Sequence, residues 1–158
     1  MPGLKKVWTT MTKRFKINII SLIYLLNFMN INTKFVEWVL RIAVFGTFFG
    51  HGMFALQKKA GWFKYFESVG ITNPDTIGTM LVLVGIIDIA LAVLVLIRPV
   101  RAALLWMAIW GLWTAMIRWP VGSDPIWDFV ERWANWGAPL ALLLLIGWPK
   151  KLKDWFSR

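Results

Sequence analysis

The sequence predicts an all-α protein: an integral membrane four-helix bundle, preceded by an amphipathic helix that lies at the membrane interface. Three observations predict this fold. Hydrophobic residues make up 58% of the chain and charged residues only 16%, against about a quarter charged in a typical soluble domain. Four apolar stretches approach the roughly 20 residues that a helix needs to cross a hydrocarbon core. Ten of the eighteen Lys and Arg residues lie in the first 34 or last nine positions, flanking those stretches.

The chain divides into three regions. Residues 1–34 form a basic amphipathic segment, in which residues 17–31 are expected to be an interfacial helix, because this apolar run is about fifteen residues long and is interrupted by Asn. The possibility that residues 17–31 form a fifth span stays open. Residues 35–149 form the bundle, and residues 150–158 form a basic cytoplasmic tail. The predicted spans are Phe35–Leu56, Thr76–Ile97, Pro99–Arg118 and Trp133–Trp148, the last of which could begin near Pro125.

Basic residues set the orientation and the expected partners. With four spans, the amino terminus, the turn Arg98–Arg101 and the tail share one side, which holds twelve Lys and Arg residues. Both termini are therefore predicted to be cytoplasmic in a multi-pass protein of the cell (inner) membrane. The net charge of +10 fits lipid headgroups better than nucleic acid, because it flanks apolar segments. The expected partners are the lipid bilayer and a protein partner or a second copy of the chain.

The chain contains no Cys and one His. This excludes disulfide chemistry, Cys-ligated metal sites and a haem held by two His residues of one chain. No metal site is predicted, because a single His with scattered carboxylates lacks the spacing of a ligand set. No nucleophile–base set or phosphate-binding loop occurs. The catalytic residues are unknown, and the motifs leave open whether the protein is an enzyme.

Ionisable residues inside the spans are candidates for a site, because a charge in a bilayer needs a partner or a role. Arg41 and His51 lie on one face of the first span, and Asp88 lies near the middle of the second. An ion pair between Arg41 and Asp88 is the simplest way to neutralise both. This pair would either fix the helix register or bind a polar ligand head or a proton. The first span also contains Gly46, Gly50 and Gly52, whose small size would let another helix approach closely.

A second polar group is expected at the outer ends of the spans. His51 lies roughly 8 Å from the outer end of its helix, and Arg118 and Asn135 come from span ends on that side, with Trp113 as an aromatic wall. An outward-facing pocket is therefore predicted there. Taking both groups together, the candidate ligand-binding residues are Arg41, His51, Asp88, Trp113, Arg118 and Asn135.

The first span reads Arg41-Ile-Ala-Val-Phe-Gly46-Thr-Phe-Phe-Gly50-His51-Gly52. It resembles the opening helix of the DoxX-like family, whose pattern is an Arg, a Gly and then a His-Gly pair. The resemblance continues through Gly85, Asp88 and the basic turn, and covers roughly residues 35–148. It implies a four-helix membrane bundle with Arg41, His51 and Asp88 as the main site residues. Some members of the family resemble the membrane subunit of a thiosulfate:quinone oxidoreductase, and others accompany redox proteins.

These observations lead to two main functional hypotheses. The first is a membrane-embedded subunit of a redox complex that binds a quinone or a similar flat lipophilic ligand in the bundle. Arg41, His51 and the Trp-rich third helix would contact the quinone, and a partner or a bound cofactor would supply electrons. The alternative is a non-enzymatic membrane assembly or anchoring protein, whose intramembrane charges are structural. A solute or proton pathway usually needs repeats or broken helices, which are not evident.

Overall fold

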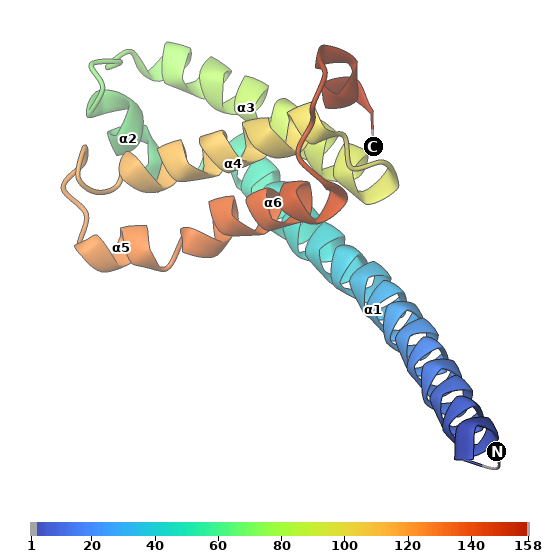
Figure 1. The fold of residues 1–158 in the computed structure, drawn as a ribbon. Helices are drawn as coiled ribbons and strands as arrows, with labels where there is room; N and C mark the ends of the chain where they lie inside the picture. Colours follow the sequence, from blue (N-terminus) through green and yellow to red (C-terminus); the bar gives the residue numbers. More distant parts are fainter. Residues whose placement is uncertain (1–2, 158) are drawn as a thin grey trace. The chain divides into compact units, whose positions relative to one another are not determined.

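The computed structural model describes the backbone of residues 3–157 and the side chains of residues 21–24 and 32–157. All regular structure within this described part is helical (Figure 1), which confirms the all-α prediction. Contacts divide the chain into two units, Met1–Val36 and Glu37–Arg158, and each is described by itself. The elements are α1 (Gly3–Leu56), η1 (Ala60–Trp62), α2 (Phe63–Glu67), α3 (Pro74–Ile97), α4 (Arg101–Met116), α5 (Ile126–Val130), α6 (Trp133–Ile146) and η2 (Leu152–Phe156).

Two helical segments of the described chain are long and apolar enough to cross a membrane. They are Asn32–Leu56, with 25 residues, and Pro74–Ile97, with 24 residues. α4 and α6 have 16 and 14 residues, which at 1.5 Å per residue cover about 24 and 21 Å. α4 is shorter than its predicted span because Val100 is still extended. α6 ends at Ile146 because Gly147 has a φ of +94°, which stops a right-handed helix.

The helix α1 is continuous where the sequence predicts a boundary near residue 34. No Pro or Gly occurs between Leu4 and Phe45, and Asn costs a helix only about 0.7 kcal/mol relative to Ala. The Asn and Lys residues that suggest a separate segment therefore do not end the helix. The prediction of an interfacial face over residues 17–31 concerns side chains that mostly lie outside the described residues.

Local sequence signals explain where α3 begins. Asn73 is extended, and its side-chain oxygen accepts a hydrogen bond from the backbone N–H of Thr76 at 3.0 Å. Pro74 follows at the first helical position, where its missing N–H removes no helical hydrogen bond. An N-cap of this kind stabilises a helix by about 1 kcal/mol. The helix therefore begins two residues before the predicted Thr76.

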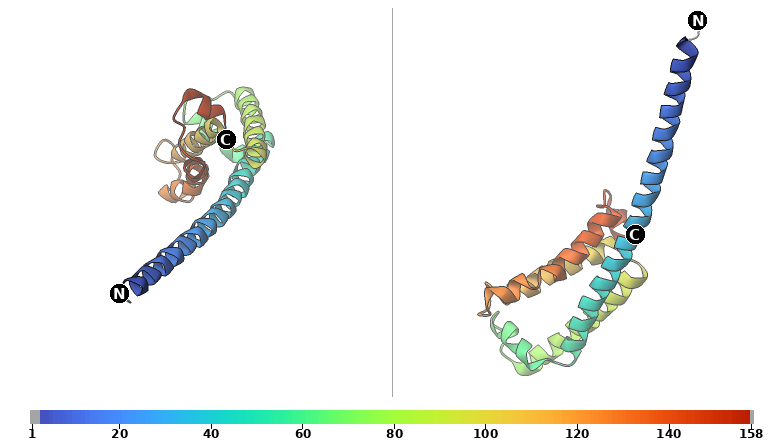
Figure 2. Two further views of the ribbon diagram at one scale, coloured as in Figure 1. Left: turned by 45° about the vertical axis from the view of Figure 1, so that its right-hand side comes forward. Right: turned by 90° about the horizontal axis from the view of Figure 1, so that it is seen from below.

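The main hydrophobic core of residues 37–157 takes side chains from four helices. Figures 1 and 2 show α4 beside α6, and α3 beside the last turns of α1. The core lies toward the end of the bundle where α3 and α6 finish, and a smaller cluster lies toward the opposite end, beneath α2. The main core comprises Val44, Phe48, Ala92, Val95, Leu104, Met107, Leu142 and Leu143.

Glycines allow close approach at two helix contacts. A Cβ at Gly52 would lie 2.9 Å from the carbonyl oxygen of Gly85, and a Cβ at Gly85 would lie 2.8 Å from the carbonyl oxygen of Gly52. α1 and α3 therefore cross with their backbones in contact. At Gly111, where α4 meets α6, a Cβ would lie 2.7 Å from the Asn135 carbonyl oxygen. Gly46 and Gly50, predicted with Gly52 as contact positions, have nothing within 4 Å of an added Cβ.

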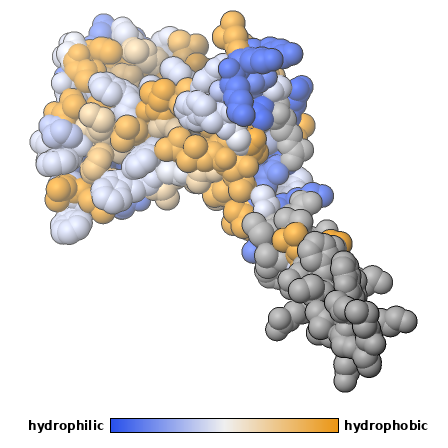
Figure 3. Space-filling model, in the orientation of Figure 1, coloured by the Kyte–Doolittle hydropathy of each residue, from blue (hydrophilic) through white to orange (hydrophobic). Residues whose placement is uncertain are grey.

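Large apolar side chains also cover the outer surface of the helices. Figure 3 shows apolar side chains over much of the displayed face of the residues that it colours. Many of these side chains have close to half of their surface exposed, and exposed apolar surface is costly in water. Examples are Leu83, Ile86, Ile87, Ile109 and Leu144.

Candidate functional site

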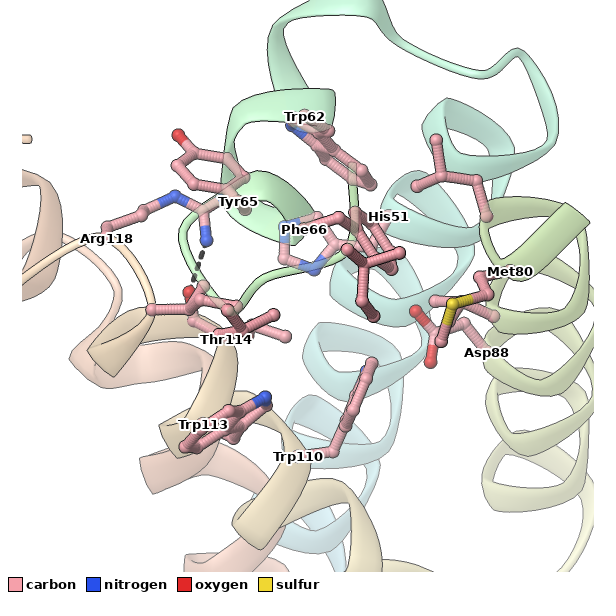
Figure 4. A pocket seen from close by; sticks show the side chains of 15 residues that line it. His51, Trp62, Tyr65, Phe66, Met80, Asp88, Trp110, Trp113, Thr114 and Arg118 are labelled. Atoms are coloured by element: carbon pink, nitrogen blue, oxygen red, sulfur yellow. Dashed lines mark hydrogen bonds between the residues drawn. The ribbon is translucent and has the colours of Figure 1, made fainter. Parts of the chain in front are cut away.

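A pocket of about 300 Å³ lies between α1, α2, α3 and α4, toward the end of the bundle that carries α2. Figure 4 shows its side chains converging from these helices. Most of the lining is aromatic or aliphatic, including Trp62, Phe66, Met80 and Trp110. A size at the lower end of ligand pockets and an apolar lining fit a ligand of one or two rings.

Four of the six predicted site residues line this pocket. They are His51 on α1, Asp88 on α3, Trp113 on α4 and Arg118 directly after α4. Arg41 and Asn135 are not among the lining residues. Asn135 instead packs its backbone against Gly111 in the α4–α6 contact.

Arg118 is the cation of the pocket and is only 4% exposed. It donates a hydrogen bond to the Thr114 carbonyl oxygen, and its guanidinium lies 4.5 Å from the centre of the Tyr65 ring. Its Nε has no hydrogen-bond partner. Among the described residues, no carboxylate forms an ion pair with it. A buried guanidinium with spare donors is suited to an acceptor oxygen on a ligand.

Asp88 is the carboxyl group of the pocket and is 3% exposed. The indole of Trp110 is its polar neighbour and can donate a hydrogen bond to it. Within the described chain, no Lys, Arg or His lies within ion-pair distance of this carboxyl group. Burial of an acid without a cation is costly, so Asp88 is a candidate to bind a ligand donor or to carry a proton.

His51 lies at the α2 end of the pocket. Its ring meets the Trp62 ring edge-on, with centroids 5.8 Å apart. The positive charges of Arg118, Arg132 and Lys59 act on it. The two ring nitrogens of His51 are groups that can hydrogen-bond to a polar atom of a ligand.

The predicted ion pair between Arg41 and Asp88 is wrong. Arg41 donates from Nε to the Val95 carbonyl oxygen at 3.1 Å, and from Nη2 to the carbonyl oxygens of Leu96 and Ile97 at 2.6 and 2.7 Å. These are carbonyls of the last turn of α3, which have no partner within the helix. The negative end of the α3 dipole also favours a cation at this position. Helix-end carbonyls, and not Asp88, are therefore bound to Arg41.

Other groups complete the surroundings of Arg41. Its Nη1 lies 3.5 Å from Glu37 Oε1, one turn earlier on α1, and its guanidinium lies 4.3 Å from the Trp38 ring centre. Arg101 binds the end of α6 in a similar way. It donates to the carbonyl oxygens of Gly147 at 2.8 Å and Ile146 at 3.0 Å. Both arginines thus cap helix carboxyl ends on the same side of the bundle, away from the pocket.

Polar contacts between α2 and the segment after α4 hold Tyr65 at the pocket. Asp124 accepts hydrogen bonds from the Lys64 ammonium through Oδ1 and from the Tyr65 hydroxyl through Oδ2, the latter at 2.7 Å. The Asp124 backbone N–H donates to the Arg118 carbonyl oxygen at 3.1 Å. Asp124 therefore connects α2 to the segment that carries Arg118. The Lys64 bond, and then the Tyr65 bond, lower the pKa of Asp124 below its ordinary value of 3.8.

Lys64→Gln is expected to raise the pKa of Asp124 back toward 3.8, because the Lys64 bond is the largest cause of its depression. A depressed carboxyl pKa stabilises the fold above pH 3.8, and this stabilisation is lost as the pH falls through the lower folded value. The check is a carboxyl ¹³C NMR titration of Asp124 in the intact protein. Lys58→Gln is the matched control and should leave the midpoint unchanged. An equal midpoint in wild type and Lys64→Gln would contradict the bond.

Sequence reasoning missed the η1 and α2 residues of the pocket; on α4 it found the Trp-rich face and Trp113, but not Thr114 and Ile117. Trp110, Trp113, Thr114 and Ile117 line the pocket at the spacing i, i+3, i+4 and i+7, which places them on one helical face. This periodicity was a usable signal. Trp62, Tyr65 and Phe66 carry no such signal, because their position depends on how α2 folds back over the bundle.

The described residues contain no group of three His, Cys, Asp or Glu side chains that could hold a metal ion. Comparisons with family models, curated proteins and solved structures found no match to the chain. The resemblance to the DoxX-like family stays a prediction from the sequence.

Proposed function

We propose that the chain is a four-helix integral membrane protein that binds a flat lipophilic ligand of the quinone class, as the membrane subunit of a redox complex. In this proposal α1, α3, α4 and α6 cross the bilayer of the cell membrane, with both termini cytoplasmic. The outward apolar side chains described above support contact with lipid. Trp133 and Trp148, at the two ends of α6, are 52% and 54% exposed, as expected of interfacial anchors for a short helix.

The observation that carries the ligand proposal is the apolar pocket with one buried cation and one buried acid. Trp110 and Trp113 offer ring surfaces, and the N–H groups of Arg118 can donate hydrogen bonds to a carbonyl oxygen of a quinone. Asp88 can accept a hydrogen bond from the hydroxyl of a reduced ring. The quinone would supply the redox chemistry, and the residues of this chain would bind it and fix its orientation.

Trp113→Leu and Arg118→Met are each expected to weaken the binding of a short-chain benzoquinone analogue to the detergent-purified protein. For Arg118→Met, the lost hydrogen bond to a charged group corresponds to about 1.5–3 kcal/mol, or roughly tenfold or more in Kd; Trp113→Leu removes the ring surface against which the analogue packs. Isothermal titration calorimetry gives the Kd. Trp106→Leu is the matched control, because Trp106 is also on α4 and 49% exposed but does not line the pocket.

Equal losses in Trp106→Leu and Trp113→Leu would show that the analogue binds the apolar surface and not the pocket. If the benzoquinone analogue does not bind the wild-type protein, the proposal of a quinone-class ligand is wrong. Purification with a stoichiometric protein partner and no extractable small molecule would favour the anchoring alternative.

A further inference from the structure

The carboxyl-terminal segment of residues 148–157 is folded, although its composition suggests only a basic tail. Arg101 donates from Nη1 to the carbonyl oxygens of Asp154 and Ser157, at 3.3 and 3.2 Å, and to the Ser157 hydroxyl oxygen at 3.0 Å. The Asp154 carboxylate accepts hydrogen bonds from the backbone N–H groups of Lys150 and Lys151. These bonds hold the segment against the first turn of α4.

Held in this way, the segment exposes large apolar side chains. Leu152 is 79% exposed, Phe156 is 70% exposed, and Trp148 is 54% exposed. Pro149 is buried, and Trp155 packs edge-on against Trp148 with ring centroids 5.7 Å apart. The buried Pro149 and the hydrogen bonds from Arg101 thus hold the segment on the protein, while Leu152 and Phe156 are exposed.

Basic residues accompany these apolar side chains. Lys150, Lys151 and Lys153 are exposed. Asp154 is the acid of this segment, and its carboxylate is turned toward its own backbone. Figure 1 places the segment at the upper right, where Figure 3 shows hydrophilic side chains gathered next to apolar ones. Apolar groups next to lysines match the boundary between the hydrocarbon and the anionic headgroups of a bilayer.

We propose that residues 148–157 form a membrane-surface anchor that binds anionic phospholipids on the side of the bundle where α6 ends. Leu152 and Phe156 insert at the headgroup–hydrocarbon boundary, and the three lysines bind the phosphate groups of that leaflet. Arg101 is the positioning residue, because it connects the segment to α4 and α6. The inference rests on the proposed membrane placement of the bundle and is independent of the pocket ligand.

The absence of Cys from the sequence allows a direct test with single spin labels in the full chain. Leu152→Cys, Phe156→Cys and Lys151→Cys are each labelled with a nitroxide and placed in nanodiscs of phosphatidylcholine with phosphatidylglycerol. Collision rates with oxygen and with a water-soluble nickel chelate report depth. Labels at 152 and 156 should favour oxygen and lie near the headgroup boundary, and the label at 151 should favour nickel. Nickel-favoured labels at both 152 and 156 would overturn the anchor.

Two further experiments distinguish a failure of the anchor from a failure of the proposed membrane placement. Ile87→Cys, at a position that is 49% exposed on α3, should report the hydrocarbon core; an aqueous reading there would remove the membrane placement itself. Nanodiscs of phosphatidylcholine alone, or replacement of the three lysines by Gln, should move the labels at 152 and 156 toward water. Each removed lysine should lower the ratio of inserted to detached segment by about fivefold. Unchanged depth in both cases would overturn the assignment to anionic lipid.

Discussion

Gly85→Ala should destabilise the protein by about 1–3 kcal/mol, the usual cost of overpacking a filled site. The added Cβ would lie 2.8 Å from the Gly52 carbonyl oxygen and 2.8 Å from Leu56 Cγ. The Leu side chain can turn away, but the backbone oxygen cannot, so α1 and α3 must separate. Gly85→Val should cost more, because its two methyl groups meet the same backbone. Unfolding in mixed micelles of increasing SDS content, followed by circular dichroism, gives the free energy.

Gly46→Ala is the matched control on α1, because an added Cβ there has nothing within 4 Å. Ala is favoured over Gly in a helix by up to about 1 kcal/mol, so this variant should be as stable as wild type or more stable. Similar losses at Gly46 and Gly85 would mean that the close crossing does not exist. The contrast between the two variants therefore tests the packing of α1 on α3 and not helix propensity.

Arg41→Met should cost on the order of 3 kcal/mol, since hydrogen bonds to a charged group contribute about 1.5–3 kcal/mol each and do not add fully. The variant leaves the last carbonyl oxygens of α3 without a donor and leaves Glu37 without its nearby cation. Arg41→Lys should recover only part of the loss, because an ammonium lacks the planar fork that binds several oxygens at once. The same SDS titration measures both variants.

Combining Arg41→Met with Asp88→Asn distinguishes the helix cap from an ion pair. Groups that do not interact give additive changes, within about 0.5 kcal/mol. The structure predicts additivity, because Arg41 binds the end of α3 and Asp88 lies in the pocket. If the double variant loses clearly less unfolding free energy than the two single variants lose together, Arg41 and Asp88 do interact. That result would support the ion pair and contradict the helix cap.

The sequence was sufficient for the helices that carry strong local signals. The approximate ends predicted at Leu56 and Ile97 agree with the observed helix ends, because the apolar runs stop there and polar residues or Pro follow. Three residues that the sequence placed in one outer group, His51, Trp113 and Arg118, line the same pocket, because depth along each helix follows from a fixed rise per residue. Asp88, which the sequence assigned to a separate group with Arg41, lines this pocket as well. His51 and Arg118, for example, both come from helix ends on one side.

The partner of Arg41 was missed for a physical reason. Depth places Asp88 about 5 Å deeper than Arg41, and the search for a counter-charge favoured the one acid inside the predicted second span, Thr76–Ile97. Backbone carbonyls at a helix end are also partners for a cation, but every residue has one, so the residue types do not show which carbonyls are available. The α2 residues over the pocket were missed because they depend on chain folding between elements, and local periodicity does not report this.

The two capping arginines also determine how the bundle can open. Arg41 connects α1 to α3, and Arg101 connects α4 to α6, both at the end opposite the pocket. The pocket lies between α3 and α4, which belong to different connected pairs. Within residues 37–157, each capping arginine therefore joins one pair of helices, and both joints lie at the end opposite the ligand space. A ligand too large for the pocket would have to move the α1–α3 pair away from the α4–α6 pair, and the hydrogen bond from Tyr65 to Asp124 would oppose that separation.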